Sequence, residues 1–268
     1  MTSSFLITLR EGLEASLIVA ILLTYLSKTN RKQDARYVWI GTASAVLACL
    51  VAGTAIYLAV SGLNGKVEMA VEGTIALVAA AVLTQMIFWM RKNSQQLSAE
   101  LRAKVDKSAK TALFTIAFVA VVREGLETVL FLLSAETSSA SGTSVVVGGL
   151  IGLAASVILG IAIFAGGRKV NLKQFFNITA VLLIMFAAGL AGKAVHEYRE
   201  LISWENGWLV QPAWEMAKGS LWESGTFYDF MKGFFGWHYA AENIRVITYF
   251  AFLLPTLYFY RKPVKSAA

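Results

Sequence analysis

The stretches LREGLEASLIVAILL at residues 9–23 and VREGLETVLFLL at residues 122–133 share a five-residue word, REGLE, within otherwise apolar sequence. Successive residues of a helix are about 100° apart, so the three charges of each copy fall within about 100° of one another. Each copy therefore predicts an apolar helix that carries one arginine and two glutamates on a single narrow face.

The composition around these words is that of a membrane protein. Of the 268 residues, 57% are hydrophobic and 15% are charged, and the mean hydropathy is +0.61. These values exclude an ordinary soluble domain. The net charge of +7 is not gathered on a basic face with interleaved aromatic residues, so we expect no nucleic-acid partner. One cysteine, Cys49, and two histidines without a CxxC pair argue against a disulfide framework, zinc and iron–sulfur chemistry.

Seven apolar stretches are long enough to cross a bilayer core, which takes about 20 helical residues. We expect an all-α polytopic membrane protein with spans at residues 3–26, 37–61, 67–90, 111–134, 144–166, 174–195 and 241–260. Lysine and arginine gather in the loops after the first, third and fifth spans and in the C-terminal tail. By the positive-inside rule, the N-terminus lies outside the cytoplasmic (inner) membrane and the C-terminus lies in the cytoplasm.

The sixth loop, residues 197–240, is the long extracytoplasmic segment of this arrangement. It is acidic and holds five of the seven tryptophans, namely Trp204, Trp208, Trp214, Trp222 and Trp237. Such sequences are typical of short helices that rest on outer headgroups, so we expect membrane lipid as the partner of this loop.

The two REGLE copies lie near the middle of the first and fourth spans, which cross the membrane in opposite directions. This spacing predicts an inverted repeat within a single membrane domain, residues 1–268, with the substrate site near the bilayer midplane. The first repeat covers residues 1–90 and the second covers residues 111–195. The seventh helix, residues 241–260, is an addition to the repeats.

Six charges near the membrane centre can have a structural or a functional origin. The structural alternative is a self-neutralising arginine–glutamate pair, four residues apart, that pins two helices together. Six such charges would cost roughly 15 kcal/mol before pairing, at about 3 kcal/mol each. Each copy also leaves one carboxylate without a guanidinium. A functional origin is therefore favoured, as is usual for ionisable residues inside a span.

If the two helices cross at the motifs, four carboxylates converge beside two arginines. The predicted metal ligands are Glu11, Glu14, Glu124 and Glu127, with Arg10 and Arg123 as charge partners. We expect Gly12 and Gly125 to let the two backbones approach closely. Carboxylate oxygens suit hard cations such as Fe³⁺, Mn²⁺ or Mg²⁺, whereas Cu(I) would favour a cysteine or methionine cluster.

Two further glutamates lie on one face of the outer end of the third span, in the sequence KVEMAVEG. Glu68 is near the surface, and Glu72 is one turn deeper. An acidic residue in the first turn also complements the helix dipole, which is the alternative explanation for Glu68. Glu72 is too deep to serve only as a cap, so we expect the pair to lead a cation toward the midplane.

Seven spans with REGLE in the first and fourth resemble the oxidase-dependent iron permeases, which include fungal high-affinity iron permeases and bacterial EfeU-type permeases. The resemblance covers essentially the whole chain. It implies that iron is the substrate carried by the REGLE residues, and we expect it as Fe³⁺ delivered by a partner oxidase. It also implies a separate ferroxidase, or periplasmic iron-binding and haem-peroxidase components, as partners.

Two other functions are compatible with the same carboxylates. One is a carrier of another divalent metal, such as Mn²⁺ or Pb²⁺. The other is an intramembrane di-iron oxidase, although helical di-iron sites usually pair Glu-x-x-His motifs and neither His196 nor His238 has a glutamate three residues before it. We therefore expect a permease and not an enzyme, with no permanently bound cofactor.

Overall fold

The computed structural model describes residues 2–93, 110–137, 142–166, 172–217, 220–223 and 226–262. These residues form helices and no named β-strand, with one isolated bridge between Pro212 and Glu242. The predicted all-α class is confirmed. The long helices are α1 (Thr2–Lys28), α2 (Ala35–Ser61), α3 (Lys66–Asn93), α5 (Lys110–Thr137), α6 (Gly142–Gly166), α7 (Leu172–Leu201) and α9 (Asn243–Arg261). The shorter ones are η1 (Lys32–Asp34), η2 (Trp208–Val210) and α8 (Thr226–Phe235).

Each of the seven predicted spans coincides with one long helix. Four segments of the described chain are apolar and long enough to cross a membrane, judged by length and composition: Lys32–Ser61, Lys66–Lys92, Thr143–Ala162 and Phe176–Leu201. Helices α1 and α5 are comparable in length, with 27 and 28 residues, but each carries the three REGLE charges. The chain is thus a multi-pass membrane protein, and the number seven stays a prediction.

Helix α7 continues to Leu201, beyond the predicted end of the sixth span at residue 195. The predicted span followed the apolar sequence alone, and the helix itself is longer. The last two turns are polar, and their ion pairs support helical structure: Lys193 lies 3.9 Å from Glu197, and His196 lies 3.6 Å from Glu200.

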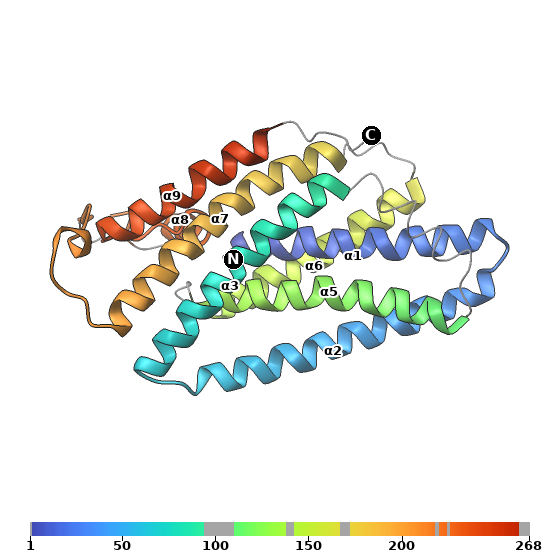
Figure 1. The fold of residues 1–268 in the computed structure, drawn as a ribbon. Helices are drawn as coiled ribbons and strands as arrows, with labels where there is room; N and C mark the ends of the chain where they lie inside the picture. Colours follow the sequence, from blue (N-terminus) through green and yellow to red (C-terminus); the bar gives the residue numbers. More distant parts are fainter. Residues whose placement is uncertain are drawn as a thin grey trace.

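The long helices pack in pairs. Helix α1 packs along α6, α2 packs along α5, and α3 packs along α7, while α1 and α5 also contact each other (Figure 1). If residues 1–90 correspond to residues 111–195, exchanging the two halves turns the α1–α6 pair into the α5–α2 pair. The packing is compatible with the inverted repeat, which stays a prediction.

Small residues make two of these pairs possible. A Cβ atom at Gly12 of α1 would lie 2.9 Å from the Ser156 Cβ of α6, and one at Gly125 of α5 would lie 3.2 Å from the Cys49 Cβ of α2. Both distances are too short for comfortable packing. The glycines therefore line the α1–α6 and α5–α2 contacts, and their expected role between α1 and α5 was wrong. Helical geometry gives the reason, because Gly12 lies about 150° around α1 from the centre of the charged face.

The core lies between α1, α3, α5, α7 and α9. Its fully buried members include Ile7, Leu83, Phe131 and Ile184. The outward faces of α2 and α6 are also apolar, with large exposed side chains such as Leu47, Leu50, Leu150 and Ile158. A soluble protein would not leave so much apolar surface uncovered, so these faces suit contact with lipid.

Several basic residues lie where α1, α3 and α9 end. Lys28 occupies the last turn of α1, and Arg91 occupies the last turn of α3. The Arg91 Nη2 atom donates to the Lys262 carbonyl oxygen at 2.6 Å, so the ends of α3 and α9 lie together. Five other basic residues of the third and fifth loops lie outside the described residues: Arg102, Lys104, Lys107, Arg168 and Lys169.

Candidate metal centre

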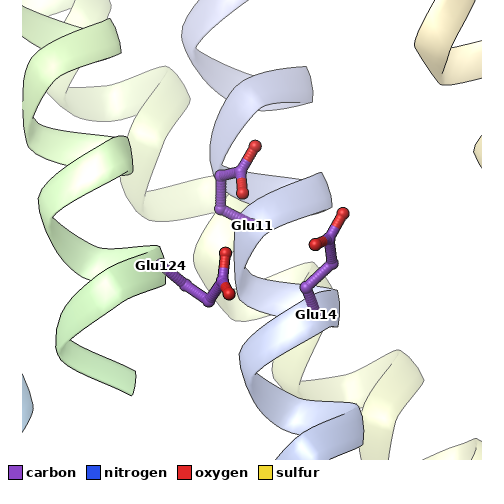
Figure 2. A group of neighbouring side chains, drawn as sticks. All are labelled: Glu11, Glu14 and Glu124. Atoms are coloured by element: carbon purple, nitrogen blue, oxygen red, sulfur yellow. The ribbon is translucent and has the colours of Figure 1, made fainter. Parts of the chain in front are cut away.

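Three carboxylates converge between α1 and α5. Glu11 and Glu14 project from α1, and Glu124 projects from α5 toward them (Figure 2). One carboxylate oxygen from each lies within 4.8 Å of the others, and no comparable group of three histidines, cysteines or acidic residues occurs elsewhere in the described chain. The exposed fractions of Glu11, Glu14 and Glu124 are 1%, 6% and 6%. The first REGLE copy and one residue of the second therefore form a buried oxygen cluster.

Arg10 supplies the positive charge inside this cluster. Its Nη1 atom lies 3.0 Å from Glu11 Oε1, and its Nη2 atom lies 3.1 Å from Glu14 Oε1. The Met86 sulfur of α3 accepts a further contact from Nη1 at 3.4 Å. The arginine is 2% exposed, so the ion pairs act with little solvent screening.

The carboxylates keep oxygens that no protein group satisfies. Glu11 Oε2, Glu124 Oε2 and Glu127 Oε2 are buried and have no hydrogen-bond partner. The Glu14 Oε1 atom is close enough to Arg10 for an ion pair but lacks hydrogen-bond geometry. Buried carboxylate oxygens without partners are costly, and a bound cation would supply the missing contacts.

The second REGLE copy is arranged differently. Arg123 Nε donates to Glu127 Oε1 at 3.1 Å, and the Arg123 side chain is 44% exposed. Its guanidinium lies 4.6 Å from the centroid of the Trp89 ring. Glu127 is not one of the three converging carboxylates, so four equivalent ligands are not present in this arrangement.

Neither Glu68 nor Glu72 belongs to this cluster. Glu68 is exposed in the first turn of α3. Glu72 Oε2 accepts from Lys193 Nζ of α7 at 2.9 Å. Lys193 was not among the predicted site residues, although a lysine inside the apolar span at 174–195 is a signal visible in the sequence. The access route that we expected through Glu72 contains a buried ammonium group.

A second set of ion pairs joins the end of α7 to the start of α9. His196 Nδ1 lies 2.8 Å from Glu242 Oε1, and Arg199 Nη2 lies 3.2 Å from the same oxygen. The three-residue spacing of Glu242 and Arg245 predicts a local pair, which the structure does not form. The two α7 residues hold the carboxylate instead.

Comparison with known proteins agrees with this arrangement. Residues 1–259 match the iron permease FTR1 family. The ferrous iron permease EfeU of Yersinia pestis is 36% identical over 270 residues, which cover 98% of this chain and 94% of the relative. The putative inactive ferrous iron permease EfeU of Escherichia coli K12 is also 36% identical, over 98% of this chain and 96% of the relative. No solved structure matches the chain. A buried carboxylate cluster within apolar helices and a family match along nearly the whole sequence lead to one conclusion: the chain belongs to the iron permease FTR1 family.

Proposed function

We propose that this permease carries iron across the cytoplasmic membrane through the carboxylate cluster of α1 and α5. The observation that supports this most strongly is the convergence of Glu11, Glu14 and Glu124 within 4.8 Å, inside a bundle with apolar outer faces. Iron is the substrate, bound transiently by these oxygens. In this proposal the N-terminus lies outside and the C-terminus lies in the cytoplasm.

Arg10 acts as the resident counter-ion of the empty cluster. It neutralises part of the charge of Glu11 and Glu14 through contacts of 3.0 and 3.1 Å. An arriving iron ion repels the guanidinium and competes for the same oxygens, so binding weakens the arginine pairs. The ion can then leave again because the guanidinium reclaims the carboxylates.

The charges of the two motifs bear on the oxidation state of the cargo. Four carboxylates and two guanidinium groups leave a net charge of −2 when all six are ionised. A divalent ion neutralises this charge, whereas a trivalent ion leaves one positive charge in a low-dielectric setting. The relatives are named ferrous iron permeases. We therefore propose Fe²⁺ as the ion that the cluster holds, in place of the Fe³⁺ that the sequence resemblance led us to expect.

Fe³⁺ from a partner oxidase remains the second candidate for the cargo. Its support is the hard, all-oxygen character of the cluster, which favours trivalent iron. In that case a separate ferroxidase, or periplasmic iron-binding and haem-peroxidase components, would supply the ion. Mn²⁺ and Pb²⁺ are the competing divalent cargoes.

The inverted repeat gives the cluster its place in a transport cycle. The contacts of α1 with α6 and of α5 with α2 support such a repeat, and the cluster lies where α1 meets α5. Rocking of one pair against the other would open the cluster to one side of the membrane at a time. Glu72 would serve the outer route only when Lys193 releases it.

Iron uptake into proteoliposomes tests these proposals. We expect saturable uptake with the iron clamped as Fe²⁺ by a reductant, and weaker uptake with Fe³⁺ kept in solution by a chelator. Excess Mn²⁺ and Pb²⁺ added as competitors should leave most of the iron flux intact. Greater uptake of Fe³⁺ would reverse the assignment of oxidation state, and equal, non-saturable flux of all ions would contradict a carrier site.

A further inference from the structure

A cavity of about 170 Å³ lies between α7, α8 and α9, and none of its lining residues belongs to a REGLE motif. Helix α8 packs against α7 on the side where α9 begins (Figure 1). The polar part of the lining has three permanent cations, two imidazoles and one carboxylate: Lys193, Lys232, Arg245, His196, His238 and Glu197. The excess of positive groups is unusual beside a proposed cation pathway.

Arg245 is a deeply buried cation of this lining. Its side chain is 9% exposed, and its Nη2 atom donates to the Gly236 carbonyl oxygen at 3.2 Å. The Nε atom is buried without a hydrogen-bond partner. No ion pair joins this arginine to a carboxylate in the part of the chain that the structure describes. Buried charges are normally paired, so a partner of opposite charge is missing here.

The nearby carboxylates are already engaged by other cations. Glu197 lies 3.9 Å from Lys193 Nζ. Glu242 is held by His196 at 2.8 Å and by Arg199 at 3.2 Å. Both carboxylates act on Arg245 electrostatically, but neither forms an ion pair with it.

His238 responds to the same positive surroundings. Burial and then the charge of Arg245 lower the pKa of its imidazole most. A backbone hydrogen bond with Ala240 opposes them, and the charges of His196 and Lys232 lower the pKa further. The ring is therefore neutral at neutral pH. A potential that opposes a proton on His238 also opposes a metal ion bound by the two histidines, whose ring centroids are 6.4 Å apart.

We propose that this cavity binds a small oxyanion, such as a phosphate or carboxylate group, with Arg245 and Lys232 as its charged contacts. Charge-assisted hydrogen bonds from a guanidinium and an ammonium are the usual means of holding such a group. The oxyanion comes either from a soluble anion or from the phosphate of a lipid headgroup. The proposal does not depend on the identity of the transported ion.

Thermal unfolding of the purified, delipidated protein in detergent tests the soluble source. Sodium phosphate, compared with sodium chloride at equal ionic strength, should raise the melting temperature by about 2–4 °C near saturation. Tryptophan fluorescence reports unfolding, because the ring centroids of Trp214 and Trp237 lie 5.0 Å apart in the folded protein. Both rings line a second pocket that shares Arg245 with the cavity.

Substitutions in the cavity show whether phosphate stabilises the protein by binding there. Lys232→Gln should weaken the apparent phosphate affinity about tenfold, and Arg245→Gln should weaken it at least as much. Lys66→Gln, at an exposed lysine of α3 outside the cavity, is the matched control and should respond like the unmodified protein. The Arg245→Gln variant can disturb folding. If it cannot be purified, the measurement on Lys232→Gln, at a partly exposed residue, decides the proposal. Equal phosphate stabilisation in Lys232→Gln and the unmodified protein would overturn the proposal.

Nanodiscs distinguish the lipid source. Discs of phosphatidylcholine alone are compared with discs that also contain phosphatidic acid, in the absence of free phosphate. Stabilisation only by phosphatidic acid, reduced in Lys232→Gln, assigns the cavity to a headgroup, whereas stabilisation by phosphate in detergent assigns it to a soluble anion. No effect of either overturns the proposal, as does stabilisation by Zn²⁺ that His238→Gln abolishes. None of these measurements requires transport, so their failure is separate from failure of the proposed permease activity.

Discussion

At the residue scale, the two motif arginines occupy equivalent sequence positions in unequal surroundings. Arg10 is 2% exposed between two carboxylates, whereas the Arg123 side chain is 44% exposed and pairs with one. Arg10→Leu leaves buried charges without a partner and should destabilise the metal-free protein by about 3–5 kcal/mol. Arg123→Leu should cost less, because this arginine pairs with a single carboxylate and is not enclosed by the cluster. Thermal unfolding in detergent at neutral pH measures the difference, and equal melting temperatures for the two variants would contradict it.

The four motif glutamates should also differ in how strongly their substitution weakens iron binding. Glu11→Gln, Glu14→Gln and Glu124→Gln each keep the side-chain shape and remove a charge from the cluster, so each should weaken iron binding about tenfold or more. Glu127→Gln should have a smaller effect, because Glu127 lies with Arg123 and outside the group of three. Iron uptake into proteoliposomes, measured for each variant, compares these effects. Glu205→Gln, at an exposed residue of the outer loop, is the control. Equal losses from all four motif variants would indicate that Glu127 joins the cluster during transport.

At the scale of the helices, glycine decides how closely two pairs pack. Gly12→Leu should drive α1 away from Ser156 of α6, and Gly125→Leu should drive α5 away from Cys49 of α2. Overpacking of this kind costs about 1–3 kcal/mol or more, so both variants should melt earlier and give less folded protein. Gly62→Leu is the matched control because only a carbonyl oxygen at 4.0 Å lies near its added Cβ. A loss as large in the control would assign the effect to leucine itself.

The ion pair between α3 and α7 gives a second prediction at this scale. Lys193 is 6% exposed and lies 2.9 Å from Glu72, so Lys193→Met leaves a half-buried carboxylate without its cation. The single variant should lose about 3 kcal/mol of unfolding free energy, and the double variant with Glu72→Gln should recover part of it. Unfolding measurements on the four proteins of this cycle give the coupling. Additive losses would show that the two side chains do not stabilise each other.

At the scale of the whole molecule, the direction of every helix follows from the orientation of the first. We expect the loop between α2 and α3 outside and the loop after α1 in the cytoplasm. In a Cys49→Ala background, an impermeant maleimide should label Lys66→Cys in intact cells and Lys28→Cys only after the membrane is opened. The converse pattern would invert the proposed topology, and labelling of both in intact cells would contradict a span between them.

The sequence by itself determined the helices and the charged face. Apolar stretches of bilayer length left few alternatives to long helices, and the spacing of REGLE put Arg10, Glu11 and Glu14 on one side of α1, because helical periodicity fixes the angle between residues of one element. It also identified the family, since a charged word repeated inside two spans is a specific signal.

Only the tertiary structure decided which face meets which helix. Helical periodicity does not predict that Gly12 faces α6 or that Lys193 pairs with Glu72. It also does not predict that Glu242 pairs with His196 and not with Arg245. Each of these contacts joins residues far apart in the chain, and local spacing rules apply only within one helix. The burial that sets the strength of each charge pair, from the enclosed Arg10 to the half-exposed Arg123, arises from packing and is invisible in the sequence.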